Sequence, residues 1–394
     1  MIRSLLSVAT GLSMAALMAA PVLGQADDPV ALPAGEMDAA ERDRIDAAIV
    51  DLLDRNPELP ALYIGIWDPE RGAYTAAYGT ADLDSGRAAS VEDHLRIGSI
   101  SKTFTGAVVL QLVDEGLVEL DATVEETAPE LASRFPDVAD RTVAQLLTMS
   151  SGIPDYANVP DGVVGGIAAD PSRVWSADEL VQIGIDGGLA DPGTPGYSTT
   201  NYILLQEIAE DVTGTSLADL IAERLAGPLA LEQTALPAAD DVALPDPFAR
   251  GYLTTACAEE IIEDGGTAAP GIEAGADVTE WSHSWGQGGG GMYSTVEDLG
   301  TWAASMAGSS LLSPELAQER LDRAVAVEGV GDYGLGIIDF GGIYGHEGEI
   351  FGWEGVFFQE PVGGVSAVVA GNSCAINDVL LEAYAILNPA AAGA

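Results

Sequence analysis

The order of strand-like and helix-like patterns along the chain constrains its fold most strongly. Strand-like runs lie near both ends of the 394 residues, and helical patterns fill the middle. Residues 61–68 and 73–78 are two such runs, and the turn sequence P-E-R-G between them predicts a hairpin. Four more short runs follow, at 333–340, 342–346, 353–359 and 364–370. We therefore expect an α/β (α+β) fold, in which both ends of the chain build one antiparallel sheet that is flanked by helices and carries a large, mostly helical insertion.

The helical patterns are spread over the whole length of the chain. Residues 37–56 repeat apolar side chains with helical spacing on a charged background, which predicts an amphipathic helix. A second helix is expected to begin near Ser99 and to end at Gly116. The segment 237–291 is rich in glycine, proline and acidic residues, so we expect loops there. Other helices are expected at 142–152, 200–214, 294–306 and 377–387.

The first residues have the pattern of an export signal. A short basic start precedes an apolar stretch at 5–20, and small residues follow in the spacing of a cleavage site. We expect residues 1–26 to be a signal peptide and 27–394 to form a single domain. Its α/β part would come from about 37–98 and 292–388, and its helical part from about 99–291. The protein is expected in the periplasm or outside the cell, without a stable membrane span after cleavage.

The charge of the chain argues against several functions. Its formal net charge is −47, from 62 acidic and 15 basic residues, and phosphate backbones and anionic lipid surfaces repel such a chain. We therefore expect no nucleic-acid partner. Fourteen of the basic residues are arginine, and Lys102 is the only lysine. An acidic, arginine-biased composition accounts for the scarcity of lysine, so only the position of Lys102 is informative.

No metal site or cofactor is predicted. Cys257 and Cys374 fit an oxidising compartment either as a bridge or as free thiols, and two cysteines without clustered histidines do not make a zinc site. The three histidines lie far apart in sequence. His283 has tryptophans two residues away on each side and could line a pocket, although a loop that packs on itself is the simpler interpretation.

The position of the single lysine suggests chemistry. Ser99 and Lys102 are three residues apart and would lie on one face of a helix. A serine hydroxyl becomes a nucleophile when a base takes its proton, and lysine can act as that base once burial lowers its pKa. Chance spacing is the alternative for this pair alone. Tyr197, in a loop before a helix, and His346, on a strand before Gly348, are further candidates that each have structural alternatives.

Five sequence blocks together resemble the superfamily of serine β-lactamases and penicillin-binding proteins, on its class C side. R-I-G-S-I-S-K-T-F (96–104) is similar to the S-x-x-K element, and L-L-T-M-S-S-G-I-P-D-Y (146–156) to an L-L-x-H-T-S-G-L-P-x-Y block. The other three are P-G-T-P-G-Y-S-T-T-N-Y-I-L-L, like Y-x-N; G-G-G-G-M-Y-S-T-V-E-D-L, like a glycine-rich block; and G-H-E-G, like K-T-G or H-x-G. The blocks stand in the family's order and cover most of residues 37–388.

The resemblance implies a role for each matching residue. Ser99 would be acylated, Lys102 would be its base or electrostatic partner, and Tyr197 would carry the proton to the leaving group and back to the deacylating water. Backbone N–H groups of Ser99 and of Glu349, which follows Gly348, would form an oxyanion hole. His346 would line the site from its strand.

The chain also departs from the family's pattern. Thr199 replaces the asparagine of Y-x-N, and the last motif has no lysine. Glu347 stands where other members have a threonine or serine that binds the substrate's carboxylate. If Glu347 faces the site, carboxylate-bearing substrates are disfavoured, because like charges repel. Strand alternation leaves the opposite orientation open, and Arg250 or another arginine could compensate.

The predicted function is an exported serine hydrolase that acts through an acyl-enzyme on an amide or ester. A D-alanyl-D-alanine carboxypeptidase-like peptidase is the first expectation, so the partner would be a small peptide, a peptidoglycan fragment or an ester. An esterase of the same fold is the close alternative, and weak β-lactamase activity comes third. The contrasting class is a non-catalytic relative that binds cell-wall fragments or a protein partner.

Overall fold

The computed structural model describes residues 32–159, 162–265, 271–306 and 311–389. The expected signal peptide, 1–26, lies outside these residues. Within them, no helix combines the length and the apolar composition that crossing a membrane requires.

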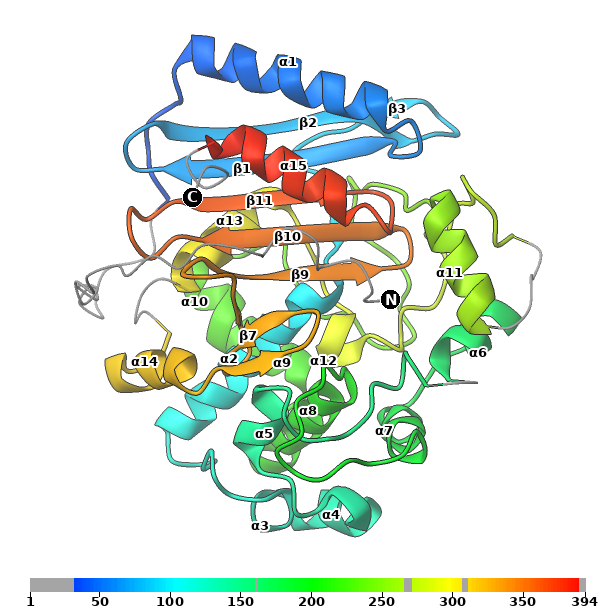
Figure 1. Ribbon diagram of the computed structural model, residues 1–394, viewed down its shortest axis with the longest axis vertical. Helices are drawn as coiled ribbons and strands as arrows, with labels where there is room; N and C mark the ends of the chain where they lie inside the picture. Colours follow the sequence, from blue (N-terminus) through cyan, green and yellow to red (C-terminus); the bar gives the residue numbers. More distant parts are fainter. Residues whose placement is uncertain (1–31, 160–161, 266–270, 307–310, 390–394) are drawn as a thin grey trace.

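A nine-stranded antiparallel sheet is the centre of the described fold (Figure 1). Its order is β3-β2-β1-β11-β10-β9-β8-β7-β6, so the N-terminal hairpin pairs with the C-terminal strand β11. The expected fold class, with one sheet built from both ends of the chain, is thereby confirmed. The strands are β1 Ala61–Asp68, β2 Gly72–Asp82, β3 Arg87–Ala88, β6 Val325–Val327, β7 Gly331–Tyr333, β8 Ile338–Asp339, β9 Tyr344–Ile350, β10 Trp353–Gln359 and β11 Ser366–Gly371. A separate pair joins β4 Leu95–Arg96 to β5 Tyr293–Ser294.

Helices cover both faces of the sheet. On one face lie α1 Ala39–Arg55 and α15 Asn377–Leu387, which run side by side in Figure 1. On the other face lies the helical part of the chain, which in sequence follows the N-terminal hairpin and precedes β6. Its helices are α2 Ser101–Asp114, α3 Val124–Thr127, α4 Pro129–Arg134, α5 Val143–Leu147, α6 Val163–Ala169, α7 Ala177–Asp186, α8 Thr200–Thr213, α9 Leu217–Ile221, α10 Gly227–Leu229, α11 Thr255–Gly265, α12 Gln287–Gly290, α13 Val296–Met306 and α14 Pro314–Asp322, with short turns η1 Gly98–Ile100, η2 Pro136–Val138 and η3 Ala222–Ala226.

Strand β1 shows why its sequence is an unbroken apolar run. All eight of its residues are buried. Leu62, Ile64 and Ile66 pack in the core under α1 and α15, whereas Tyr63 and Trp67 pack in the larger core on the helical side. Because side chains alternate between the faces of a strand, a strand that is covered on both sides needs apolar residues at successive positions.

Helix α2 runs through the middle of the larger core. Eleven of its fourteen residues are buried, including Lys102. Phe104 stacks on Trp302 of α13 with ring centroids 3.8 Å apart, and the indole N–H of Trp302 donates to Thr103. A helix that is covered on every side has no solvated face, so any charged side chain on it needs a partner inside the protein.

The structure corrects three of the predicted elements. The segment 237–291 is not all loop, because α11 and the short α12 lie in it; α11 begins after Thr254, whose hydroxyl accepts from the N–H of Cys257. The run 333–340 is two strands, since Gly336 breaks it with a φ of +75°. The strand expected at 342–346 begins at Tyr344 and continues to Ile350 as β9, so G-H-E-G-E lies within the strand.

A disulfide ties α11 to the segment before α15. Cys257 and Cys374 are bonded and both are buried, which answers the question the sequence leaves open. The bridge closes a loop with a sequence separation of 117 residues. A cross-link over so long a stretch restricts the unfolded chain strongly.

Replacing both cysteines by alanine is expected to lower the free energy of unfolding by about 2–4 kcal/mol. Urea denaturation followed by tryptophan fluorescence measures the change against the wild-type protein. An unaltered midpoint and slope would contradict a stabilising role for the bridge.

Candidate active site

Ser99 lies in the turn η1, immediately before the buried helix α2. Gly98 begins this turn with a φ of +49°, and a Cβ atom on it would lie 2.7 Å from the backbone of Glu349. Only glycine therefore allows the turn to approach β9 so closely. Ser99 itself is partly exposed, whereas its neighbours Gly98 and Ile100 are buried. Its hydroxyl can thus meet a substrate from outside while its backbone is held rigidly.

Lys102 contacts the serine from inside the protein. Its side chain has no exposed surface, and its Nζ lies 2.9 Å from the Ser99 Oγ and 2.7 Å from the carbonyl oxygen of Gly289. The ring of Tyr197 is 5.0 Å from the same nitrogen. Burial lowers the pKa of Lys102 to about 7, although the carboxylate of Asp155 opposes that decrease. Near neutral pH a large fraction of Lys102 is a free amine, which is the form that accepts a proton from serine.

Tyr197 completes the group around the nucleophile. It is half-buried, and burial raises its pKa well above the usual range, while a hydrogen bond with the Ser99 side chain opposes the rise. The phenol is therefore neutral and can donate or relay a proton, but it does not act as a standing phenolate base. Thr199, two residues later, is buried and donates its hydroxyl to Asp155 at 3.2 Å.

The ring of His346 lies next to the ring of Tyr197. It has no exposed surface, its Nε2 lies 2.9 Å from the hydroxyl of Tyr333, and its Nδ1 contacts the carbonyl oxygen of Glu347. The hydroxyl of Tyr333 in turn contacts that of Tyr202 at 3.4 Å. Burial, and secondarily the charge of Lys102, lower the pKa of His346 to about 3, so the ring is neutral. His346 is thus a buried support of the site, with no open face toward solvent.

The backbone of β9 lies against the nucleophile turn. A Cβ atom at Gly348 would be 2.0 Å from the carbonyl oxygen of Ile97 and 2.9 Å from the N–H nitrogen of Ser99. The nitrogen of Glu349 would in turn be 2.7 Å from a Cβ at Gly98. The two backbone nitrogens that the sequence suggests as an oxyanion hole therefore come from adjacent, tightly packed segments.

Three carboxylates lie where β9 and β10 meet the start of α15. Glu347 accepts from the Asn377 amide at 3.1 Å, Glu349 from the Ala375 N–H at 3.1 Å, and Glu354 from the N–H of Ile376. Burial raises the pKa of Glu347 and of Glu349 to about 7, and Glu260 adds to the effect at Glu349. The charge of Glu347 also contributes to raising the pKa of Tyr197.

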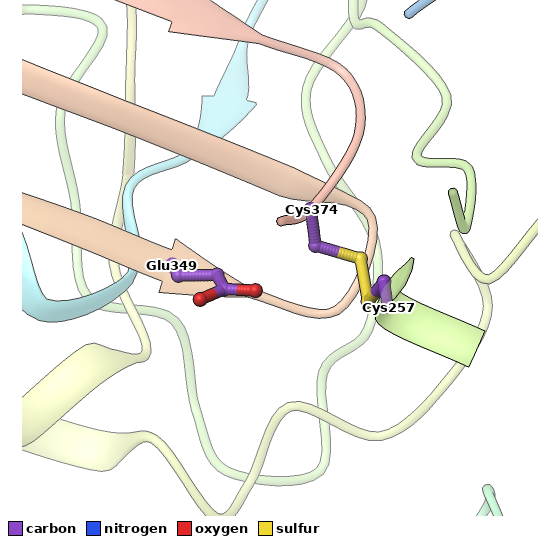
Figure 2. Close-up of side chains that lie close together, drawn as sticks. All are labelled: Cys257, Glu349 and Cys374. Carbon is purple, nitrogen blue, oxygen red and sulfur yellow. A yellow bond between two sulfur atoms is a disulfide. The ribbon is translucent and has the colours of Figure 1, made fainter. Parts of the chain in front are cut away.

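Glu349 also lies beside the disulfide (Figure 2). One carboxylate oxygen and the sulfurs of Cys257 and Cys374 are within 4.8 Å of one another. Because the sulfurs are bonded to each other, they are not thiolate ligands for a metal.

Several residues of the site lie outside the sequence prediction. Asp155 is the second-last residue of the 146–156 block, and its contact with Thr199 is seen only in the folded protein. Gly289, whose carbonyl holds Lys102, lies in the glycine-rich block. Tyr333 and Asn377 carry no local motif, and their places depend on long-range packing.

A cavity of about 180 Å³ lies on another side of the glycine-rich segment. His283 lines it together with Arg96, Gln206 and Gln287, so this histidine does reach a pocket. The ring also packs edge-on against Trp353 at 5.6 Å. Ser99, Lys102 and Tyr197 are not among the lining residues, and the cavity is therefore separate from the catalytic group.

A family model described as Beta-lactamase matches residues 45–387. Penicillin-binding protein 4 of Amycolatopsis lactamdurans is 31% identical over 160 residues, which are 40% of this chain and 40% of that protein. A D-aminopeptidase of Cereibacter sphaeroides is 30% identical over 197 residues, 48% of this chain and 36% of that protein. The chain thus spans about two fifths of the length of these curated relatives.

Solved structures with the same fold cover more of the chain. D-amino acid amidase from Ochrobactrum anthropi SV3 has a TM-score of 0.75 at 21% identity, over 89% of this chain and 99% of that one. A D-stereospecific amidohydrolase from a Streptomyces species has a TM-score of 0.70 at 27% identity, over 86% and 97%.

The reaction of Ser99 with a neutral fluorophosphonate is expected to depend on pH through Lys102. The reactive form has an uncharged amine, so the rate should rise as pH increases through about 7 and be about tenfold below its plateau at pH 6. Intact-mass time courses measure it. Lys102→Ala should lose between about 10² and 10⁴ in rate, and a wild-type rate that is flat between pH 5 and 9 would contradict the assignment.

Gly348→Ala is expected to lower the rate of Ser99 labelling by at least about a hundredfold, because the new methyl group must displace the nucleophile turn. Gly35→Ala is the matched control, since nothing lies within 4 Å of a Cβ there. Labelling at the wild-type rate in Gly348→Ala would show that the close contact is unimportant.

Proposed function

The chain belongs to the Beta-lactamase family, and we propose that within this family it is a serine hydrolase that opens an amide bond through an acyl-enzyme on Ser99. The observation that carries the proposal is the 2.9 Å contact between the Ser99 Oγ and the Nζ of a fully buried lysine with a pKa of about 7. A lysine with an ordinary pKa would be an ammonium at neutral pH and could not take the serine proton.

The proposed acylation uses the residues in a defined order. The Ser99 proton moves to the Lys102 amine as the Oγ attacks the substrate carbonyl carbon. The negative charge of the tetrahedral intermediate is held by the backbone N–H groups of Ser99 and Glu349. The carbon–nitrogen bond then breaks, the leaving amine takes a proton from the Tyr197 hydroxyl, and Lys102 returns its extra proton to that oxygen. Water, deprotonated by the same pair, hydrolyses the ester and regenerates Ser99.

The edge of β9 supports binding of an extended substrate. β8 pairs with β9 only at Tyr344 and Gly345, so within the described residues the stretch from His346 to Ile350 has no strand partner on that side. A substrate backbone can add to such an edge through main-chain hydrogen bonds. This stretch contains Gly348 and Glu349, which lie against the nucleophile turn.

We propose that the substrate carries a free amino group rather than a free carboxylate. Glu347 is half-buried and acts on Tyr197, and its pKa of about 7 means that a substantial fraction of this carboxyl group is ionised at neutral pH. A substrate carboxylate would be repelled, whereas an ammonium group would be attracted. The D-aminopeptidase and the D-stereospecific amidohydrolase among the relatives support an amide of a D-amino acid or a peptide that begins with one.

The carboxypeptidase and esterase activities expected from the sequence remain predictions. A D-alanyl-D-alanine carboxypeptidase must accept a terminal carboxylate, and the charge of Glu347 disfavours this. An esterase requires no such group and differs from the proposed amidase in its leaving group only. We therefore keep an esterase activity at the same Ser99 as the second candidate.

Export is also proposed. Two features support it: the signal-like pattern of residues 1–26 and the disulfide between Cys257 and Cys374. Disulfides form and persist mainly in oxidising compartments, such as the periplasm or the extracellular space.

The proposal is tested by intact-mass analysis after a fluorophosphonate, with Ser99→Ala as control, followed by hydrolysis assays. D-phenylalanine amide, its N-acetyl derivative, a D-alanyl-D-alanine peptide and a neutral ester would be compared. Ser99-dependent labelling with fastest hydrolysis of the free D-amino-acid amide agrees with the proposal. A preference for the N-acetylated amide or for the carboxylate-bearing peptide contradicts the substrate assignment, and absence of labelling contradicts the hydrolase itself.

Glu347→Gln is expected to reduce the preference for the free amine over its N-acetyl derivative by about tenfold, since one attractive charge is lost. The pKa of Glu347 is about 7, so in the wild-type protein this preference should increase as pH rises through that value and the carboxylate ionises. The ratio of kcat/KM values for the two substrates is the measurement. Glu328→Gln, at an exposed position, controls for net charge, and an unchanged ratio in Glu347→Gln would exclude this residue as a determinant.

A further inference from the structure

Asp155 is a buried carboxylate next to the catalytic lysine. It lies in the loop after α5 and is 6% exposed. Its Oδ2 accepts from the Thr199 hydroxyl at 3.2 Å, and its Oδ1 accepts from the N–H of Ala157 at 3.1 Å. Among the described residues, no arginine or lysine nitrogen lies within ion-pair distance of it. The backbone N–H of Thr199 is a further neutral donor. A carboxylate whose hydrogen-bond donors are all neutral is costly to bury, so a nearby positive charge would stabilise it.

A short chain of contacts joins Asp155 to Lys102: the Thr199 hydroxyl donates to Asp155, the Thr199 methyl group lies against Gly289, and the Gly289 carbonyl accepts from the Lys102 Nζ. The positive charge closest along this chain is the ammonium form of Lys102. Burial raises the pKa of Asp155, and the charge of Lys102 is the largest effect that opposes the rise. The relation is reciprocal, since Asp155 is the charged group that opposes the burial effect at Lys102. The two residues come from elements far apart in sequence and share one desolvated region.

We propose that Asp155 is a positioning residue for acylation, which acts through Lys102 by stabilising the ammonium that forms when this lysine accepts the Ser99 proton. The inference rests on the proposed function, because it concerns the same nucleophile and base. It adds a residue outside the serine, lysine and tyrosine set, and it assigns Thr199 the task of orienting a carboxylate.

The other titratable groups around this region do not offer an alternative counter-charge. Tyr156, Tyr197 and Tyr202 are neutral, because burial raises the pKa of each phenol. His346 is neutral as well, because burial lowers its pKa to about 3. The carboxylate of Glu347 accepts from the Asn377 amide on the side of α15. Asp155 therefore remains as the anion that compensates the lysine.

Thr199 holds the carboxylate in place, and its hydrogen bond opposes the rise of the Asp155 pKa. Its hydroxyl donates to Asp155, and its methyl carbon packs near Gly289, whose carbonyl accepts from Lys102. Threonine has a single hydroxyl donor, and at position 199 this donor is used on the Asp155 carboxylate.

The test is the pH dependence of Ser99 labelling by a fluorophosphonate in Asp155→Asn. Without the negative charge, the ammonium form of Lys102 is less stable and its pKa decreases. The acid limb of the rate profile should therefore move to lower pH by about one unit or more. A role in folding alone would lower the rate at every pH and leave the limb in place. Asp191→Asn, an exposed loop position, makes the same change in net charge and should leave the limb unchanged.

Thr199→Val provides a second variant if Asp155→Asn does not fold. The side chains have similar shapes, and the valine removes one of the hydrogen bonds that oppose the rise of the Asp155 pKa. A smaller shift of the limb in the same direction is therefore expected. A limb that stays in place or moves to higher pH in a folded variant would overturn the role of Asp155. Absence of labelling in the wild-type protein would instead refute the proposed hydrolase, so the two failures are distinguishable.

Discussion

The contact between the buried Lys102 amine and the Ser99 hydroxyl is the interaction on which the rest of the site depends. A lysine on a helix with no solvated face cannot keep an ordinary pKa, and this cost of burial is what makes it a base near neutral pH. The glycines serve the same contact. Gly98 and Gly348 let the nucleophile turn and β9 approach at distances that a side chain would prevent.

Buried carboxyl groups lie on two sides of the site, and we propose a different role for each side. On the helical side, the anion of Asp155 supports positive charge on Lys102. On the side of α15, the carboxylates of Glu347, Glu349 and Glu354 crowd together, and burial raises their pKa values. In the proposed function, the first arrangement serves the proton transfer, and the second selects the charge of the substrate.

Some elements of the fold and some residues of the site can be predicted from the sequence, and others cannot. The contact between Ser99 and Lys102 is predictable from their spacing of three residues, and β1, β10 and α15 follow from local apolar patterns. Asp155 is not identifiable, because its meaning depends on a contact 44 residues away at Thr199. The sequence analysis misses α11 because the segments around it are rich in glycine and acidic residues. It also misses the break at Gly336, because this break depends on a backbone angle that an apolar pattern does not encode. The orientation of the Glu347 side chain could not be predicted either, because strand alternation alone permits either face of the sheet.

The most direct test of the central claim is the titration of Lys102 itself. Because it is the only lysine of the chain, uniform incorporation of ¹³Cε-labelled lysine gives one side-chain signal in an NMR spectrum. The account predicts that this signal titrates with a pKa of about 7 in the free protein. A pKa near 10, the ordinary value for lysine, would mean that Lys102 is charged at neutral pH and would contradict its role as the base that activates Ser99.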